Sequence, residues 1–138
     1  MPRNRKHYRV RYSEAVLVHE VVLRAGGLPG ISRPDDIKSA LDRPYAGFGN
    51  KLFFRFIHQK AAALCHGLAS THGFVDGNKR TAFIMTLILL DLSGYALAPL
   101  PGEDLDQLVE DLLVRAANGD ASVEDFMAFF KPRIVRQP

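Results

Sequence analysis

The sequence has little of what a disulfide-stabilised, secreted or membrane-spanning protein requires. It holds one cysteine in 138 residues, Cys65, so no internal disulfide can form. No hydrophobic run reaches the roughly 18 residues of a membrane-spanning helix, because Thr86 and Asp91 interrupt the stretch over 82–92. The basic start of the chain is not followed by a hydrophobic segment, so it does not resemble a secretion signal. We therefore expect a cytoplasmic protein that folds as a single domain over residues 1–138.

Positive charge is concentrated at the two ends of the chain. Of the 18 lysines and arginines, eight lie in the first 11 or the last eight residues, and the segment between holds 10 basic and all 15 acidic residues. We interpret residues 1–9 and 132–138 as basic, solvated tails, although such tails can also contact nucleic acid or an acidic partner. No predicted face alternates basic with aromatic residues, so we expect no direct nucleic-acid binding, and no membrane contact.

Helix-forming segments dominate the sequence. Hydrophobic residues recur at helical spacing, and Gly, Pro, Asn and Ser mark the segment ends. This pattern predicts six helices, at about residues 13–23, 35–41, 52–70, 78–92, 103–117 and 122–130. The helix over 78–92 is hydrophobic on every side, which predicts a central position. Ser122 is the predicted N-cap of the last helix, with Asp125 three residues later.

The predicted fold class is all-α, a compact bundle of about six helices with at most a minor two-stranded β element. Residues 8–12 and 95–98 are the segments that look extended, and their pairing would form that element.

The chemically informative segment is residues 72–81, HGFVDGNKRT, which joins the two central helices. It leads into a helix N-terminus, where free backbone N–H groups and the positive end of the helix dipole attract anions. Lys79 and Arg80 add positive charge there, Gly77 lets a ligand approach the backbone, and Asn78 can cap the helix and donate to an oxygen. These four residues predict a phosphate-binding site.

Two further residues of this segment could add chemistry to the predicted phosphate site. Asp76 supplies the hard carboxylate oxygen that Mg²⁺ prefers when it bridges to phosphate. His72 carries an imidazole that titrates near neutral pH and suits general-base catalysis. Taken singly, however, Asp76 is typical of a turn or cap, and His72 of a surface group. The spacing alone therefore leaves open a phosphoryl-transfer enzyme and a structural phosphate-binding loop.

Other chemistry-bearing residues do not form a recognisable site in the sequence. His58, Cys65 and His66 lack the spacing of a zinc site, because adjacent residues on a helix diverge by about 100°. Cys65 is predicted to be a small buried residue rather than a redox group. His19 and His66 are assigned to packing or partner contacts, and Phe74 to anchoring its loop in the core.

The segment His72-x-Phe-x-Asp-Gly-Asn-Lys-Arg-Thr-Ala resembles the signature of the Fic/Doc family. The similarity extends outward through GGLPGI, ALDRPY, KAAALCHGLA and DLSGY, and it covers about residues 10–130. Within the family, the chain is most similar to the death-on-curing (Doc) toxins of bacterial toxin–antitoxin pairs. The resemblance implies a bundle of about six helices with the motif between two central ones.

The resemblance also implies roles for individual residues. His72 would be the general base on a target hydroxyl, and Asp76 would hold Mg²⁺. Asn78, Lys79 and Arg80 would bind the phosphates of ATP. Fic proteins generally transfer AMP to hydroxyl side chains, whereas Doc toxins are protein kinases that phosphorylate a threonine of elongation factor Tu and so arrest translation.

Two partner-binding features follow from the same resemblance. The loop over residues 43–51, with Tyr45 and Phe48, falls where the family carries a flap that positions the target. The sequence lacks the Ser/Thr-x-x-x-Glu-Gly/Asn segment of self-inhibited Fic proteins. Inhibition would therefore come from a separate antitoxin, whose disordered tail would fold into a groove on the helical surface.

Departures from the family patterns bear on the reaction. Lys79 replaces a glycine of the Fic signature and Phe83 an arginine, which changes the space and charge available to the phosphates. We therefore predict a Mg-ATP-dependent protein kinase toxin, with an AMP-transferring enzyme and a non-catalytic partner-binding module as alternatives. Gly73 and Gly77 replace a common proline and an alanine, and we expect both changes to loosen the loop.

Overall fold

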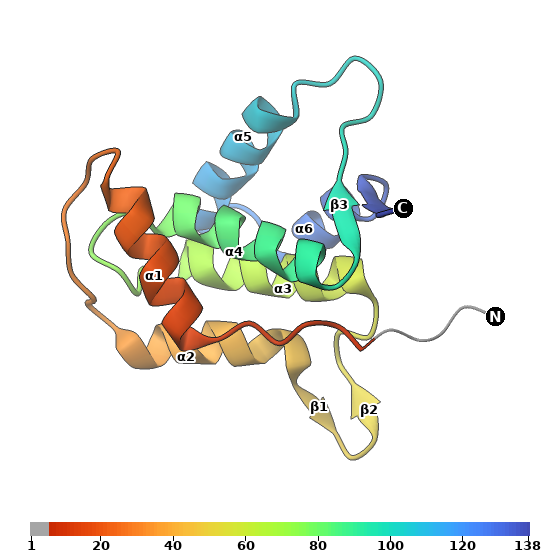
Figure 1. Ribbon diagram of the computed structural model, residues 1–138, viewed down its shortest axis with the longest axis horizontal. Helices are drawn as coiled ribbons and strands as arrows, with labels where there is room; N and C mark the ends of the chain where they lie inside the picture. Colours follow the sequence, from red (N-terminus) through yellow and green to blue (C-terminus); the bar gives the residue numbers. More distant parts are fainter. Residues whose placement is uncertain (1–5) are drawn as a thin grey trace.

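Residues 6–138, which this computed structural model describes, form six α-helices (Figure 1). The helices are α1 (Tyr12–Leu23), α2 (Pro34–Asp42), α3 (Ile57–Ser70), α4 (Asn78–Leu92), α5 (Leu105–Ala117) and α6 (Val123–Phe130), with a 3-10 turn, η1 (Arg43–Tyr45), after α2. The all-α prediction is confirmed, and the six predicted helices are present. The largest difference is at the start of α3, because Leu52 belongs to a short strand and the helix begins only at Ile57.

The antiparallel pair α3 and α4 forms the centre of the bundle (Figure 1). Ala61, Ala62 and Ala63 of α3 are fully buried, and such small side chains let a neighbouring helix approach closely. On α4, Met85 and Leu89 are fully buried in the same core. Helix α1 packs on α4, while α2 and α6 pack on α3. The predicted central position of the helix over 78–92 is confirmed.

The start of α6 shows the predicted cap. The Asp125 backbone N–H donates to Ser122 Oγ (3.2 Å), and the Ser122 backbone N–H donates to Asp125 Oδ2 (2.9 Å). This reciprocal pair satisfies N–H groups that the first helical turn leaves without partners.

The β structure of the described residues is minor, and its pairing differs from the prediction. Strand β1 (Gly47–Phe48) pairs with β2 (Lys51–Leu52), and β3 (Tyr95–Leu97) pairs antiparallel with β4 (Ile134–Arg136). The predicted pairing of residues 8–12 with 95–98 is wrong, because the C-terminal segment occupies that edge. Much of the predicted C-terminal tail is therefore paired. A three-residue strand shows too little alternation to be recognised in the sequence.

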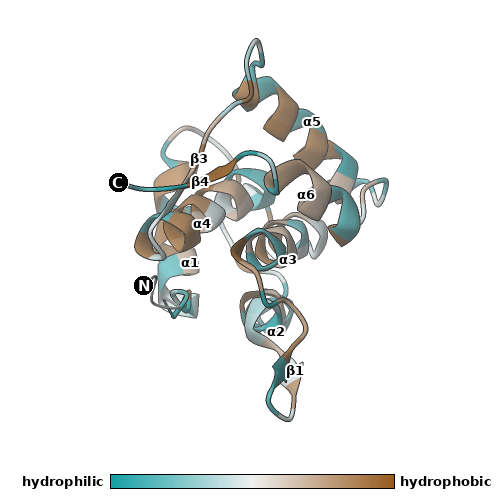
Figure 2. Cartoon of the chain, turned by 90° about the vertical axis from the view of Figure 1, so that its right-hand side faces the viewer, coloured by the Kyte–Doolittle hydropathy of each residue, from teal (hydrophilic) through white to brown (hydrophobic). Residues whose placement is uncertain are grey.

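Hydrophobic residues are concentrated in the packed helices. Figure 2 shows this as brown ribbon in α4, α5 and α6, against the teal of the connecting loops. Phe126 and Phe130 of α6 are almost fully buried and pack edge to face. Among residues 6–138, no helix combines the length and the hydrophobicity needed to cross a lipid bilayer.

We predict that Cys65 is unreactive in the folded protein. Its side chain is 1% exposed, and burial raises the pKa of the thiol to about 12. Because the thiolate is the reactive form, iodoacetamide at about pH 8 should label Cys65 only after unfolding. Mass spectrometry with and without urea measures this difference. Equal labelling rates under both conditions would contradict the prediction.

Candidate functional site

The loop between α3 and α4 reverses the chain through two left-handed backbone positions. His72 has φ +53° and Gly77 has φ +79°. A positive φ is uncommon for a residue other than glycine, and such positions cluster at functional sites. Gly77 is the N-cap of α4, so the prediction that Asn78 caps this helix is wrong.

Backbone hydrogen bonds tie this loop to the loop that follows α1. The N–H groups of Ser32 and Arg33 donate to the Gly73 carbonyl (2.8 and 2.9 Å), and the Val75 N–H donates to the Gly30 carbonyl (3.0 Å). A side chain at Gly73 would come within 2.2 Å of Ile37 Cγ1. One at Gly77 would come within 3.2 Å of Val22 Cγ1. Both glycines are therefore closely packed, and the expectation that they loosen the loop stays a prediction.

Asn78 closes the loop from within. The Phe74 N–H donates to Asn78 Oδ1 (3.0 Å), and Asn78 Nδ2 donates to the Phe74 carbonyl (2.8 Å). Both ends of the amide are therefore engaged by the backbone. The Asn78 side chain therefore holds the loop. The Asn78 backbone N–H, by contrast, has no hydrogen-bond acceptor among residues 6–138.

Phe74 and His19 form the base on which the loop rests. Phe74 is 2% exposed, and its ring stacks on His19 with centroids 3.9 Å apart and an interplanar angle of 12°. His19 Nε2 donates to the Asp76 carbonyl (2.7 Å), because a carbonyl oxygen can only accept. The predicted core role of Phe74 and the predicted packing role of His19 are confirmed.

The Asp76 carboxylate is held in its ionised form. Oδ2 accepts from the Leu28 N–H (3.1 Å), and Oδ1 accepts from the Gly77 N–H (2.8 Å). These two hydrogen bonds, with the charges of Arg80 and Lys79, lower the pKa of Asp76 below its ordinary value. The carboxylate is therefore ionised at neutral pH.

The donor set at Asp76 fits Mg²⁺ in company with a phosphorylated ligand. Residues 6–138 contain no cluster of three or more His, Cys, Asp or Glu side chains that could hold a metal ion. A single carboxylate suffices for Mg²⁺ when phosphate oxygens and waters complete its octahedral coordination. Asp76 can therefore hold the ion only together with such a ligand.

The N-terminus of α4 presents unpaired donors next to Asp76. The backbone N–H groups of Asn78, Lys79 and Arg80 have no acceptor among the described residues, and neither does the Lys79 ammonium. The Arg80 guanidinium donates to the carbonyls of Val22 (3.3 Å) and Gly26 (3.2 Å) at the end of α1. Those carbonyls lie at the negative end of a helix dipole, so they hold the cation in place.

His72 lies at the start of the loop, and its side chain is exposed. Its Nε2 lies 3.2 Å from the carbonyl of Ala117, the last residue of α5. Because that carbonyl only accepts, the contact places the proton on Nε2 and leaves the Nδ1 lone pair free. His72 is therefore held in a tautomer that can accept a proton at Nδ1.

The predicted target flap does not join this group of residues. The hairpin of β1 and β2 precedes α3, whereas the 72–77 loop follows it, and a helix of 14 residues is roughly 21 Å long. Figure 1 shows the hairpin projecting from the opposite end of α3. Phe48 is 82% exposed. Tyr45 is partly buried, and its hydroxyl donates to the Tyr8 carbonyl (2.6 Å) and accepts from the Val10 N–H (2.9 Å).

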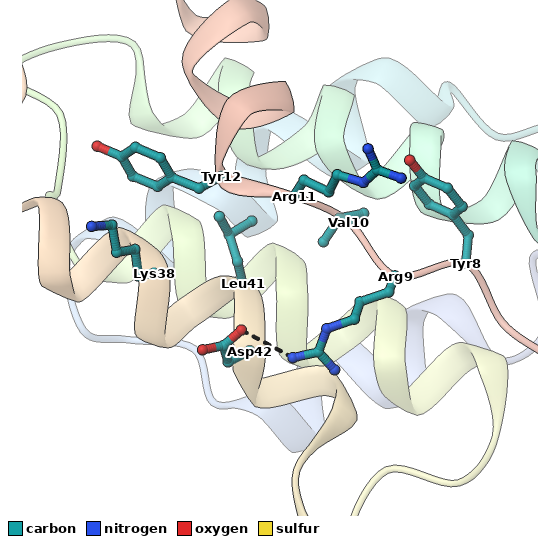
Figure 3. Close-up of a pocket in the computed structure, with 8 residues that line it drawn as sticks. All are labelled: Tyr8, Arg9, Val10, Arg11, Tyr12, Lys38, Leu41 and Asp42. Carbon is teal, nitrogen blue, oxygen red and sulfur yellow. Dashed lines mark hydrogen bonds and ion pairs between the residues drawn. The ribbon is translucent and has the colours of Figure 1, made fainter.

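A separate cleft of about 630 Å³ lies between residues 8–12 and α2 (Figure 3). Arg9 and Asp42 form an ion pair there (3.2 Å). The cleft contains none of the predicted site residues. The sequence did not predict that His19 and residues 26–33 support the 72–77 loop. These residues act through ring stacking and backbone hydrogen bonds, which leave no motif in the sequence.

Comparison with known proteins identifies one family that this chain resembles. Residues 10–90 match the family model described as the Fic/DOC family. The chain is 35% identical over 92 residues to the protein named Toxin Doc of Mycolicibacterium smegmatis, covering 67% of this chain and 68% of the relative. It is 32% identical over 111 residues to the protein named Protein kinase doc of Escherichia phage P1, covering 80% and 82%.

The structural role of Asn78 predicts a specific loss of stability. Asn78→Ala leaves the Phe74 N–H and carbonyl without partners, which should lower the free energy of unfolding by roughly 1–3 kcal/mol. Lys79→Ala is the matched control, and we expect it to change stability by less than about 0.5 kcal/mol. Urea denaturation measures both. Equal stability of the two variants would show that Asn78 does not hold the loop.

The hydrogen bonds to Asp76 predict a pH-dependent contribution to stability. Because its folded pKa lies below the ordinary value of 3.8, the stabilisation is present above that value and is lost as the pH falls through the folded pKa. Asp76→Asn should therefore be less stable than the wild type at neutral pH. Urea titrations should show this difference shrinking as the pH falls below about 4. A difference that stays constant with pH would rule out this linkage.

Proposed function

The chain belongs to the Fic/DOC family, and we propose that it is the toxin of a bacterial toxin–antitoxin pair and a Mg-ATP-dependent protein kinase. The proposed substrate is a threonine hydroxyl of elongation factor Tu, whose phosphorylation arrests translation. The observation that carries the proposal is the loop between α3 and α4. It joins an exposed imidazole, an ionised carboxylate and a helix start with unpaired donors.

The proposed phosphate cradle is the first turn of α4. The N–H groups of residues 78–80 and the Lys79 ammonium are donors without protein partners in the described chain, and they would bind phosphate oxygens. A guanidinium has five N–H donors, and the contacts to Val22 and Gly26 leave some of those of Arg80 available. Two carbonyls thus orient a cation that would otherwise be a mobile side chain.

Asp76 is the residue that would hold Mg²⁺ beside this cradle. When bound, the ion neutralises negative charge on the transferring phosphoryl group. The Leu28 and Gly77 N–H groups fix the carboxylate and keep it ionised, while each of its oxygens retains a further lone pair. Asp76 is therefore oriented before any ligand arrives.

His72 is proposed as the general base. Its Nδ1 would take the proton of the threonine hydroxyl as that oxygen attacks the γ-phosphorus, and the bond from the γ-phosphorus to the oxygen of ADP would break. The Ala117 carbonyl keeps the other ring proton on Nε2 and stabilises the imidazolium that forms. The left-handed φ of His72 is an uncommon backbone conformation of the kind that clusters at functional sites.

The name of the phage P1 relative, Protein kinase doc, supports phosphoryl transfer over AMP transfer. The presence of Lys79 supports the same choice, because its ammonium occupies space and adds charge where the Fic signature has glycine. The name of the mycobacterial relative, Toxin Doc, supports a toxin role, and the proposed inhibitor is a cognate antitoxin with a disordered tail.

Label transfer tests the proposal directly. The purified chain with Mg²⁺ is given ATP labelled on the γ- or the α-phosphate, with purified elongation factor Tu and with bacterial lysate as substrates. We expect γ-label on elongation factor Tu, and a loss of roughly 10²–10⁴-fold in His72→Ala, because a general base contributes about that factor.

His58→Ala is the matched control, since His58 lies at the other end of α3 and should leave the transfer rate unchanged. Label from the α-phosphate would identify an AMP-transferring enzyme. Equal transfer rates for the wild type and His72→Ala would show that His72 is not the general base. If neither label moves onto any protein, the kinase proposal fails and a non-catalytic binding module replaces it.

A further inference from the structure

A second, larger concavity lies at the opposite end of α3 from the candidate site. It has a volume of about 1040 Å³, and we call it the basic hollow. It is formed by the start of the described chain, the start of α3 and the ends of β3 and β4, which come together at the right-hand end of Figure 1. Its cationic lining residues are Lys6, Arg9, Arg55, Lys60 and Arg136.

The positive charge of the basic hollow is largely uncompensated. Among the described residues that line it, none is acidic. Of its five cations, Arg9 has an acidic partner within residues 6–138, Asp42, which lies outside the hollow. Lys6 and Arg9 from the start of the described chain thus lie at one surface with Arg136, which is far away in the sequence. Such a concentration of one sign of charge attracts a polyanion.

One of these cations is fixed inside the protein. Lys60 is only 4% exposed, and its ammonium lies 2.9 Å from His7 Nδ1 and donates to the Arg55 carbonyl (3.2 Å). These contacts connect the N-terminal segment to the start of α3. The arrangement of charges is therefore organised by the fold rather than left to mobile side chains.

Two aromatic rings of the hollow lie next to two of its arginines. The guanidinium of Arg9 lies over Tyr45 (4.7 Å to the ring centroid), and that of Arg55 lies over Phe56 (5.7 Å). Phe56 is 55% exposed, and its ring lies nearly parallel to that of His58, which also lines the hollow (10°, centroids 6.0 Å apart). Exposed ring faces beside arginines are the platforms on which unpaired bases stack.

We propose that the basic hollow binds single-stranded nucleic acid. Its cations would contact the phosphate backbone, and the exposed rings would stack on bases. An acidic polypeptide would neutralise the positive charges of the hollow but would not stack on its exposed rings as bases do. The sequence predicted no nucleic-acid binding because it showed no face that alternates basic and aromatic residues. In the folded chain, Tyr45 and Phe56 lie next to Arg9 and Arg55 in one hollow. The inference does not depend on the proposed kinase activity.

Fluorescence anisotropy of the full chain with labelled oligo(U) and oligo(dT) of about 20 nucleotides tests this binding. We expect binding that weakens steeply with salt. In Arg55→Ala/Arg136→Ala the slope of log affinity against log salt should be smaller by about 1.4, since each lost phosphate contact contributes about 0.7. Phe56→Leu, which keeps a hydrophobic side chain, should bind at least about fivefold more weakly because it removes a stacking face.

Arg24→Ala/Lys38→Ala is the matched control, because it removes the same charge from exposed positions outside the hollow. Unchanged binding in this control supports the proposal, and an equal loss in both double variants overturns it. Absence of wild-type binding to either oligonucleotide also overturns it. Displacement of the oligonucleotide by polyglutamate at equal charge concentration would assign the hollow to acidic polypeptides instead. Circular dichroism and label transfer by each variant show separately that fold and proposed activity are retained.

Discussion

Alanines on α3 let α4 pack directly against it, and the rest of the molecule depends on this close approach. Two antiparallel helices held this tightly leave only residues 71–77 to reverse the chain. In that short connection, His72 and Gly77 have left-handed backbone. The same packing that forms the core therefore sets the position of the imidazole and of the α4 N-terminus. The outer helices then supply the remaining contacts, α1 through Arg80 and α5 through the Ala117 carbonyl.

The candidate site lies where the ends of several helices meet. The carbonyl end of α1 holds a cation, and the amide end of α4 is open to an anion. Between them, Asp76 is held by two backbone amides, so the site contains both signs of charge without a direct ion pair. This arrangement keeps its charged groups oriented while leaving binding capacity for a ligand.

Local signals predicted much of the fold and part of the site. Helical periodicity located the six helices, and the Ser122 cap followed from two residues three positions apart. His72 and Asp76 belong to one short motif, so the sequence could identify them together. Contacts between distant segments could not be predicted in this way. The bond from the Leu28 N–H to Asp76 spans 48 positions, and the Tyr45 bond to Tyr8 spans 37. Neither leaves a periodic pattern, because each depends on where the helices pack.

The loop after α1 holds the site almost entirely through its main chain. From the loop after α1, the groups that hydrogen-bond to residues 72–77 are the amides of Leu28, Ser32 and Arg33 and the carbonyl of Gly30. The side chains of Leu28 and Ile31 are 65% and 41% exposed and make none of these bonds. Substitutions at these two positions can therefore alter the outer surface without removing a bond that orients Asp76. In this loop the exposed side chains and the main-chain bonds that support the candidate site are thus separate.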